Sequence, residues 1–322
     1  MNKNTNNNLY FHKFKLLKDF LINEYDLKDH NDVIKKIINI LFAGFKNEWK
    51  TKNQKFDFSF TFASKKYQGL RFSYNDFGED RGLYENKILQ IFNLFPGVYN
   101  KDVLKNILHL MHFPGKKHQT TFGMEWVQGE ESPRLKVYFE ELFHYYSKFS
   151  RIKFSKILSK LTATKIFLSG KENIGAICVD FLPYSNLDLK IYLLLNSIDN
   201  VEMPKNIIKF INSSQDIRSA FLNFNDLLNL ENHFFNYITY RLNKQSLSSI
   251  KFYKIYEINK MNNPDNAYKE IIKYIYLIFN NRINEIKMLF NFCKKNEVSL
   301  YPVISSIDLQ RGNCKFDLYF SF

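Results

Sequence analysis

Hydrophobic and polar residues alternate strictly in several short stretches of this chain. In residues 56–62 every second residue is Phe, with Asp, Ser and Thr between them. In residues 134–139, Leu, Val and Phe alternate with Arg, Lys and Tyr. A period of two is that of a β-strand with one buried face. Such stretches, joined in pairs by short polar turns, predict five β-hairpins that begin near residues 55, 119, 173, 233 and 300.

The pattern also predicts where each strand begins and ends. The first hairpin starts at Phe56 and returns through Leu70, Phe72 and Tyr74. The other four are expected at residues 119–127 with 132–140, 173–182 with 187–195, 233–242 with 249–258, and 300–309 with 313–322. The fourth hairpin is expected to turn through residues 243–248.

The segments between the hairpins carry apolar residues at helical spacing. One such stripe, in residues 100–112, consists of Val103, Leu104, Ile107, Leu108 and Met111. The unit of helix, strand, strand, helix therefore recurs five times, at an interval of about 60 residues. No linker rich in Pro, Gly or Ser divides the chain. We expect one α+β domain over residues 1–322, with residues 1–8 as a disordered tail.

Ten antiparallel strands in sequence order make a sheet that is wide enough to curl. Closing the sheet into a barrel removes both of its exposed edges, and the helices then cover its apolar outside. The expected architecture is a barrel of ten antiparallel strands in five αββα repeats, with the helices outside. The alternative is an open sheet whose polar face meets water.

The polar face of the second strands repeats the same residue types. Lys and Tyr stand two residues apart at Lys136–Tyr138, Lys190–Tyr192 and Lys254–Tyr256. A face that is merely solvated needs polarity, but not the same cation and the same phenol in the same order. Inside a barrel, this face would place a ring of cations, Arg71, Lys136, Lys190 and Lys254, beside a ring of tyrosines, Tyr138, Tyr192, Tyr256 and Tyr319.

Composition and charge limit the kinds of partner. The chain carries 46 Lys and Arg against 32 Asp and Glu, a formal charge of +14, which favours a nucleic acid, an anionic lipid or a phosphorylated small molecule. Its three cysteines are far apart and form neither a disulfide framework nor a zinc ligand set. The N-terminal residues are polar, without the apolar core of a signal peptide, and no apolar run is long enough for a membrane span. We expect a soluble, cytoplasmic protein.

These repeats resemble those of the aromatic prenyltransferases of the ABBA barrel fold, which include indole prenyltransferases and cyanobactin peptide prenyltransferases. The resemblance covers nearly the whole chain and depends on the order and spacing of short motifs. These are Asp57-Phe-Ser-Phe, Leu70-Arg-Phe-Ser73, Arg134-Leu-Lys-Val-Tyr138, Val179-Asp-Phe, Leu189-Lys-Ile-Tyr192 and Tyr253-Lys-Ile-Tyr256. The aspartate-rich magnesium motif of classical prenyl-chain synthases is absent from the sequence.

The resemblance implies transfer of a dimethylallyl or longer prenyl group from an allylic diphosphate to an electron-rich aromatic acceptor. The residues that would bind the diphosphate are Arg71, Lys136, Lys190 and Lys254, with Arg134 in addition. The residues that would shield the allyl cation from water are Tyr138, Tyr192, Tyr256 and Tyr319. Asp57 matches the position of the carboxylate that takes the acceptor proton in indole-modifying relatives, and Glu125 is the other inward carboxylate that could act as the base.

The acceptor is expected to be a residue of a peptide natural product or a free aromatic amino acid. Fixed Lys and Arg can stabilise a departing diphosphate without a metal, so no cofactor and no metal site are expected, and Mg²⁺ is compatible with the reaction but not required. The expected partners are the allylic diphosphate and the acceptor, with no membrane and no nucleic acid, and the protein should be a monomer. The competing hypothesis is a basic, aromatic-rich protein that binds nucleic acid or a lipidic ligand without catalysis.

Overall fold

The computed structural model describes most of the helices and strands that the sequence predicts, and some connecting residues. The described residues are 3–24, 30–42, 56–61, 69–75, 81–110, 119–126, 130–140, 148–162, 174–184, 187–194, 205–219, 222, 237–243, 246–255, 283–298, 301–310 and 313–321.

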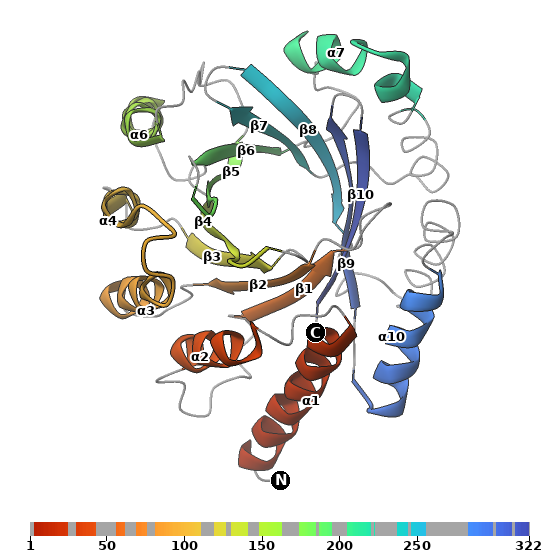
Figure 1. Ribbon diagram of the computed structural model, residues 1–322. Helices are drawn as coiled ribbons and strands as arrows, with labels where there is room; N and C mark the ends of the chain where they lie inside the picture. Colours follow the sequence, from red (N-terminus) through yellow and green to blue (C-terminus); the bar gives the residue numbers. More distant parts are fainter. Residues whose placement is uncertain are drawn as a thin grey trace.

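Ten strands form one antiparallel sheet, in which each strand pairs with its neighbours in the chain. They are β1 (Phe56–Thr61), β2 (Gly69–Asn75), β3 (Gln119–Trp126), β4 (Arg134–Glu140), β5 (Ile174–Phe181), β6 (Asp188–Leu194), β7 (Tyr237–Asn243), β8 (Ser246–Ile255), β9 (Tyr301–Gln310) and β10 (Asn313–Ser321). The sheet curls so far that β10 comes into contact with β1 (Figure 1). The five predicted hairpins are confirmed.

Helices lie on the outer, convex side of the curled sheet (Figure 1). They include α1 (Lys3–Glu24), α2 (Asn31–Phe42), α3 (Arg81–Asn93), α4 (Lys101–His109), α6 (Lys148–Thr162), α7 (Lys205–Ile211) and α10 (Ile283–Lys295). Local sequence explains the ends of some of them. The side chain of Asn100, for example, accepts a hydrogen bond from the Val103 N–H at 3.1 Å and so caps the start of α4.

The hydrophobic core lies between these helices and the outer face of the sheet. Leu135, Val137 and Phe139, the apolar half of the alternation in β4, are all fully buried. The ring of Phe139 meets Phe154 of α6 edge to face, with 5.4 Å between the ring centroids. Because the apolar residues of each strand are used in this way, the polar half of the alternation is left on the concave side.

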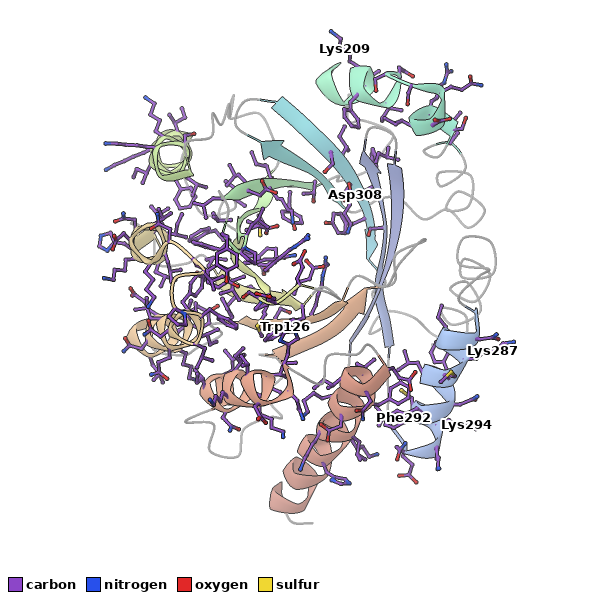
Figure 2. The ribbon with its side chains drawn as sticks, in the orientation of Figure 1. Trp126, Lys209, Lys287, Phe292, Lys294 and Asp308 are labelled. Atoms are coloured by element: carbon purple, nitrogen blue, oxygen red, sulfur yellow. The ribbon has the colours of Figure 1, made fainter. Side chains whose placement is uncertain are left out.

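The start of α1 differs from the prediction. Residues 3–8, expected to be a disordered tail, form the first part of this helix. The helix is anchored further along, where Leu17 and Leu21 are buried and Phe20 stacks on Phe292 of α10 with 4.2 Å between ring centroids. Phe292 lies on the side of α10 that faces α1, and Lys287 lies on the other side (Figure 2). A helix anchored by such packing can extend through residues of modest helix propensity.

None of the helices in the described part of the chain combines the length and the apolar character that crossing a lipid bilayer requires.

The fourth hairpin also differs from the prediction, because its turn is shorter. Strands β7 and β8 are separated by residues 244–245 alone, instead of the expected turn over residues 243–248. Strand β8 therefore begins at Ser246 rather than at residue 249. The register pairs Arg241 with Ser249 and Tyr237 with Tyr253. This register decides which residues of β8 face the concave side.

Candidate functional site

Glu125 lies on the concave side of the sheet and binds cations from both neighbouring strands. Its Oε1 accepts hydrogen bonds from Arg71 Nε at 2.8 Å and Arg71 Nη2 at 2.6 Å. Its Oε2 accepts a hydrogen bond from Lys136 Nζ at 2.6 Å. Arg71 stands directly opposite Glu125 in the β2–β3 ladder, and Lys136 stands opposite Gly123 in the β3–β4 ladder. We call Arg71, Glu125 and Lys136 the first ion cluster.

A second ion cluster follows on the next two strands. Lys190 of β6 donates a hydrogen bond from Nζ to Asp180 Oδ2, and Cys178 of β5 donates one from Sγ to Asp180 Oδ1 at 3.1 Å. Asp180 is only 1% exposed and stands opposite Lys136 in the β4–β5 ladder, so the two clusters are neighbours. The sequence prediction did not include Asp180 among the site residues, although its polar position in the alternation of β5 marks it as facing the concave side.

Tyrosine rings form a continuous row beside these clusters. The ring of Tyr138 on β4 lies 6.1 Å from that of Tyr192 on β6, measured between centroids. Tyr192 in turn lies 5.9 Å from Tyr253 on β8. Lys251 Nζ stands 5.1 Å from the centroid of the Tyr253 ring, which is within the range of a cation–π interaction. The row thus extends the site from β4 to β8.

The fourth repeat contributes Lys251 and Tyr253 to this face, where the sequence predicted Lys254 and Tyr256. Thr239 of β7 pairs with Tyr192 on one side and with Lys251 on the other, which places Lys251 in the row of concave-side residues. Lys254 occupies the opposite phase of β8. The predicted phase of this strand is therefore wrong, and Tyr256 lies outside the described residues.

The error has a simple physical cause. Residues 251–256 contain two overlapping Lys-x-Tyr patterns of opposite phase, and the charged residues alone do not distinguish them. The phase is decided by Ile250 and Phe252, which are both fully buried on the core side and therefore place Lys251 and Tyr253 on the concave side. On β9, Asp308 stands opposite Lys251 in the ladder, and Figure 2 shows Asp308 beside β8.

The remaining predicted site residues are placed by their pairing in the sheet. Arg134 stands opposite Glu125 in the β3–β4 ladder, and its Nη2 lies 2.7 Å from Glu130 Oε1, at a part-buried position. Asp57 stands opposite Ser73 of β2. Tyr319 stands opposite Ile304 of β9. The roles expected for these residues stay predictions.

The charges of the first ion cluster are strongly coupled. Burial raises the pKa of Glu125, but the attraction of Arg71 and Lys136 outweighs burial and holds this pKa well below its usual range. Burial lowers the pKa of Lys136 to about 8, although Glu125 acts in the opposite direction. Glu125 is consequently ionised at neutral pH, and Lys136 is still mostly charged there but loses its charge as the pH rises through about 8.

The tyrosines and the cysteine remain neutral. Burial is the main reason why the pKa values of Tyr138 and Tyr192 are raised well above the usual range of a phenol. Burial also raises the pKa of the Cys178 thiol, and the carboxylate of Asp180 adds to this effect. The site therefore presents uncharged aromatic faces next to fixed cations.

One polar atom of the site lacks a partner within the described part of the chain. Thr239 is 3% exposed, and its Oγ1 makes no hydrogen bond there. It stands in the ladder between Tyr192 and Lys251. Because an unsatisfied buried hydroxyl costs free energy, this atom is well suited to bind a ligand.

Taken together, the two ion clusters can bind a polyanion. Arg71, Lys136 and Lys190 carry three positive charges, and Glu125 and Asp180 carry two negative charges, so a net positive charge remains. Lys251 adds a further buried cation beside Tyr253. Such an arrangement suits a phosphorylated ligand whose other end is apolar and lies against aromatic rings.

No protein-family model and no curated protein matches the sequence. Solved structures do match. The 5-dimethylallyltryptophan synthase from Streptomyces coelicolor is 11% identical, with a TM-score of 0.58 and 91% of each chain covered. The 6-dimethylallyltryptophan synthase from Micromonospora olivasterospora, in complex with DMASPP and Trp, is 11% identical, with a TM-score of 0.59 and coverage of 89% of this chain and 90% of that one.

A third structure, AnaPT from Neosartorya fischeri, matches with 10% identity and a TM-score of 0.54, over 84% of this chain and 79% of that one. At this level of identity the likeness concerns the fold. The chain has the fold of the ABBA prenyltransferases, in agreement with the resemblance found in the sequence.

Proposed function

We propose that this chain is an aromatic prenyltransferase, which transfers a dimethylallyl or longer prenyl group from its diphosphate to an electron-rich aromatic ring. The observation that carries the proposal is the row of Tyr138, Tyr192 and Tyr253 beside the buried cations of the two ion clusters. The likeness to dimethylallyltryptophan synthases supports it. In this proposal β1 and β10 complete a closed barrel whose concave side is the reaction chamber.

The first step would break the bond between C1 of the prenyl group and the diphosphate oxygen, and the electron pair would leave with the diphosphate. Fixed cations lower the barrier because they stabilise charge that develops in the transition state. Arg71, Lys136 and Lys190 are suited to this role, and Lys251 takes the place expected for Lys254. The Thr239 hydroxyl can donate a further hydrogen bond to the diphosphate.

The allyl cation would then lie against the tyrosine row. Neutral aromatic faces attract a cation and exclude the water that would otherwise capture it. The raised pKa values of Tyr138 and Tyr192 suit this role, because a phenolate would react with the cation instead of shielding it.

In the second step, the π electrons of the acceptor ring would form a bond to C1, and the ring would lose a proton to a base. Both oxygens of Glu125 accept hydrogen bonds from cations and its pKa is low, which makes Glu125 a weak base. We therefore propose Asp57 as the base. We propose an indole or phenol ring as the acceptor, in a free amino acid or in a peptide natural product.

The proposal is tested by incubating the full chain with dimethylallyl diphosphate and a panel of tryptophan, tyrosine and cyclic peptides that contain them. Mass spectrometry should find one added C5H8 unit on an acceptor. Parallel reactions with EDTA and with Mg²⁺ test metal independence. If no allylic diphosphate gives a product with any of these acceptors, and the protein instead binds RNA in a salt-dependent manner, the proposal is wrong.

A further inference from the structure

We propose that Glu125 is a positioning residue, which holds Arg71 and Lys136 together and keeps Lys136 charged where the diphosphate binds. This inference rests on the proposed function, and it assigns to Glu125 a role other than that of the base. The carboxylate of Glu125 on β3 joins the side chains of Arg71 on β2 and Lys136 on β4, the two strands that flank its own.

The first argument is geometric. Arg71 and Lys136 are both cations, and they come from strands that are not neighbours, since β3 lies between them. Without an anion, the two side chains would repel each other. Glu125 offers one oxygen to each, at 2.6 Å, and its side chain is buried enough to exclude competing water. The carboxylate therefore fixes the distance between the two cations before any ligand binds.

The second argument concerns the charge of Lys136, which is only 4% exposed. Burial, the largest cause, disfavours its ammonium form, and Lys190 and Arg71 add to this effect by repulsion, so that the pKa of Lys136 falls to about 8 although two carboxylates oppose the shift. The charged and titratable groups around it are Arg71 on β2, Glu125 on β3, Asp180 and Cys178 on β5, and Asp188 and Lys190 on β6, with Arg134 and Tyr138 on β4 itself. Two carboxylates raise the pKa of Lys136 against these effects, and Glu125 contributes more than Asp180.

The direction of the pH dependence follows from these contacts. A lysine is charged below its pKa, so the contribution of Lys136 to diphosphate binding is complete at low pH and is lost as the pH rises through its pKa. Removing a neighbouring buried charge shifts a pKa by about one to three units. A drop of about 1.5 units would reduce the protonated fraction of Lys136 at about pH 7.5 by about eightfold.

The experiment measures binding of inorganic pyrophosphate to the full chain by calorimetry, between about pH 6 and pH 9. Removing the negative charge of Glu125 by itself favours an anion at every pH, so the prediction concerns the pH dependence. The affinity of Glu125→Gln for pyrophosphate, relative to that of the natural protein, should fall about sixfold between about pH 6 and about pH 7.5. At about pH 6 the variant should bind at least nearly as tightly as the natural protein, because Lys136 regains its proton. Affinities are compared as ratios at each pH, since pyrophosphate itself titrates. Glu131→Gln removes one carboxylate at an exposed position of the same hairpin and should leave the affinity unchanged.

Two further variants keep the test decisive if Glu125→Gln is poorly folded. Lys136→Arg carries a charge that does not titrate in this range, so its affinity relative to the natural protein should rise above about pH 8. Glu125→Asp keeps the charge and should preserve most of the pH profile.

Each outcome has a distinct meaning. If Glu125→Gln binds pyrophosphate like the natural protein at every pH, or if Lys136→Arg has an unchanged profile, the positioning role is wrong. If Glu125→Gln binds normally but loses acceptor prenylation at all pH values, Glu125 is the base after all. If the natural protein does not bind pyrophosphate, it is the proposed function that fails.

Discussion

Lys251 and Lys254 lie three residues apart on β8, and replacing each of them with Met distinguishes between the two phases of this strand. The register places Lys251 in the concave row with Tyr192, whereas Lys254 belongs to the opposite phase. Met keeps most of the apolar length of the side chain and removes only the charge. We expect Lys251→Met to impair prenyl transfer and Lys254→Met to leave it nearly unchanged.

The size of the effect follows from the surroundings of Lys251, which is 9% exposed. A hydrogen bond between a charged donor and an anionic acceptor contributes about 1.5–3 kcal/mol in such a place. With about 1.4 kcal/mol per factor of ten, kcat/KM for dimethylallyl diphosphate should fall by about 10- to 150-fold. The cation–π contact with Tyr253 is not expected to change this range, because it stabilises the free and the ligand-bound states alike.

The assay is steady-state kinetics with dimethylallyl diphosphate as the varied substrate and a saturating acceptor. Thermal melting of both variants checks that each is folded. A large loss for Lys254→Met together with normal kinetics for Lys251→Met would refute the reasoning, because it would mean that β8 presents the other Lys-x-Tyr pair to the site.

Two further predictions concern the tyrosine row and the core. Tyr192→Leu removes the central ring of the row and should let water capture the allyl cation, so that dimethylallyl alcohol forms at the expense of the prenylated acceptor. Tyr192→Phe keeps the aromatic face and should still direct the prenyl group to the acceptor. Equal ratios of alcohol to prenylated acceptor in the two variants would contradict the shielding role. Phe92→Ala removes a buried ring that meets Phe181 at 5.1 Å between centroids, and should lower the free energy of unfolding by about 3–5 kcal/mol in a urea titration. Leu83→Ala, at a position of the same helix that is 46% exposed, is the matched control, and a loss as large as that of Phe92→Ala would contradict the assigned core.

The sequence predicted the hairpins well because the alternation in most strands has only one phase. In residues 134–139, for example, Leu, Val and Phe occupy one face and leave no choice for the other. Strand β8 was the exception, since a Lys-x-Tyr pattern occurs there in both phases. A shift by an odd number of residues moves every side chain to the other face, and the two patterns begin three residues apart, so choosing the second pattern selected the wrong pair.

The partners of the site residues could not be predicted in the same way. The alternation places Glu125, Lys136 and Asp180 on one face, but it does not say which carboxylate binds which cation. That depends on the offset between neighbouring strands, for instance on Lys136 standing opposite Gly123 rather than opposite Glu125. The low pKa of Glu125, and hence its weakness as a base, depends on the same offset.

The strand order also has a consequence for how the chain folds. Because strands that are neighbours in the chain pair with each other, each hairpin closes a short loop and successive hairpins join across connections of a few tens of residues, so most of the sheet can assemble in order as the ribosome releases it. The contacts of β1 with β10 and of α1 with α10 are different, because they join segments that are hundreds of residues apart. We expect these contacts between the two ends of the chain to form last during folding and to break first under mild denaturant, while the strands that carry the two ion clusters remain folded.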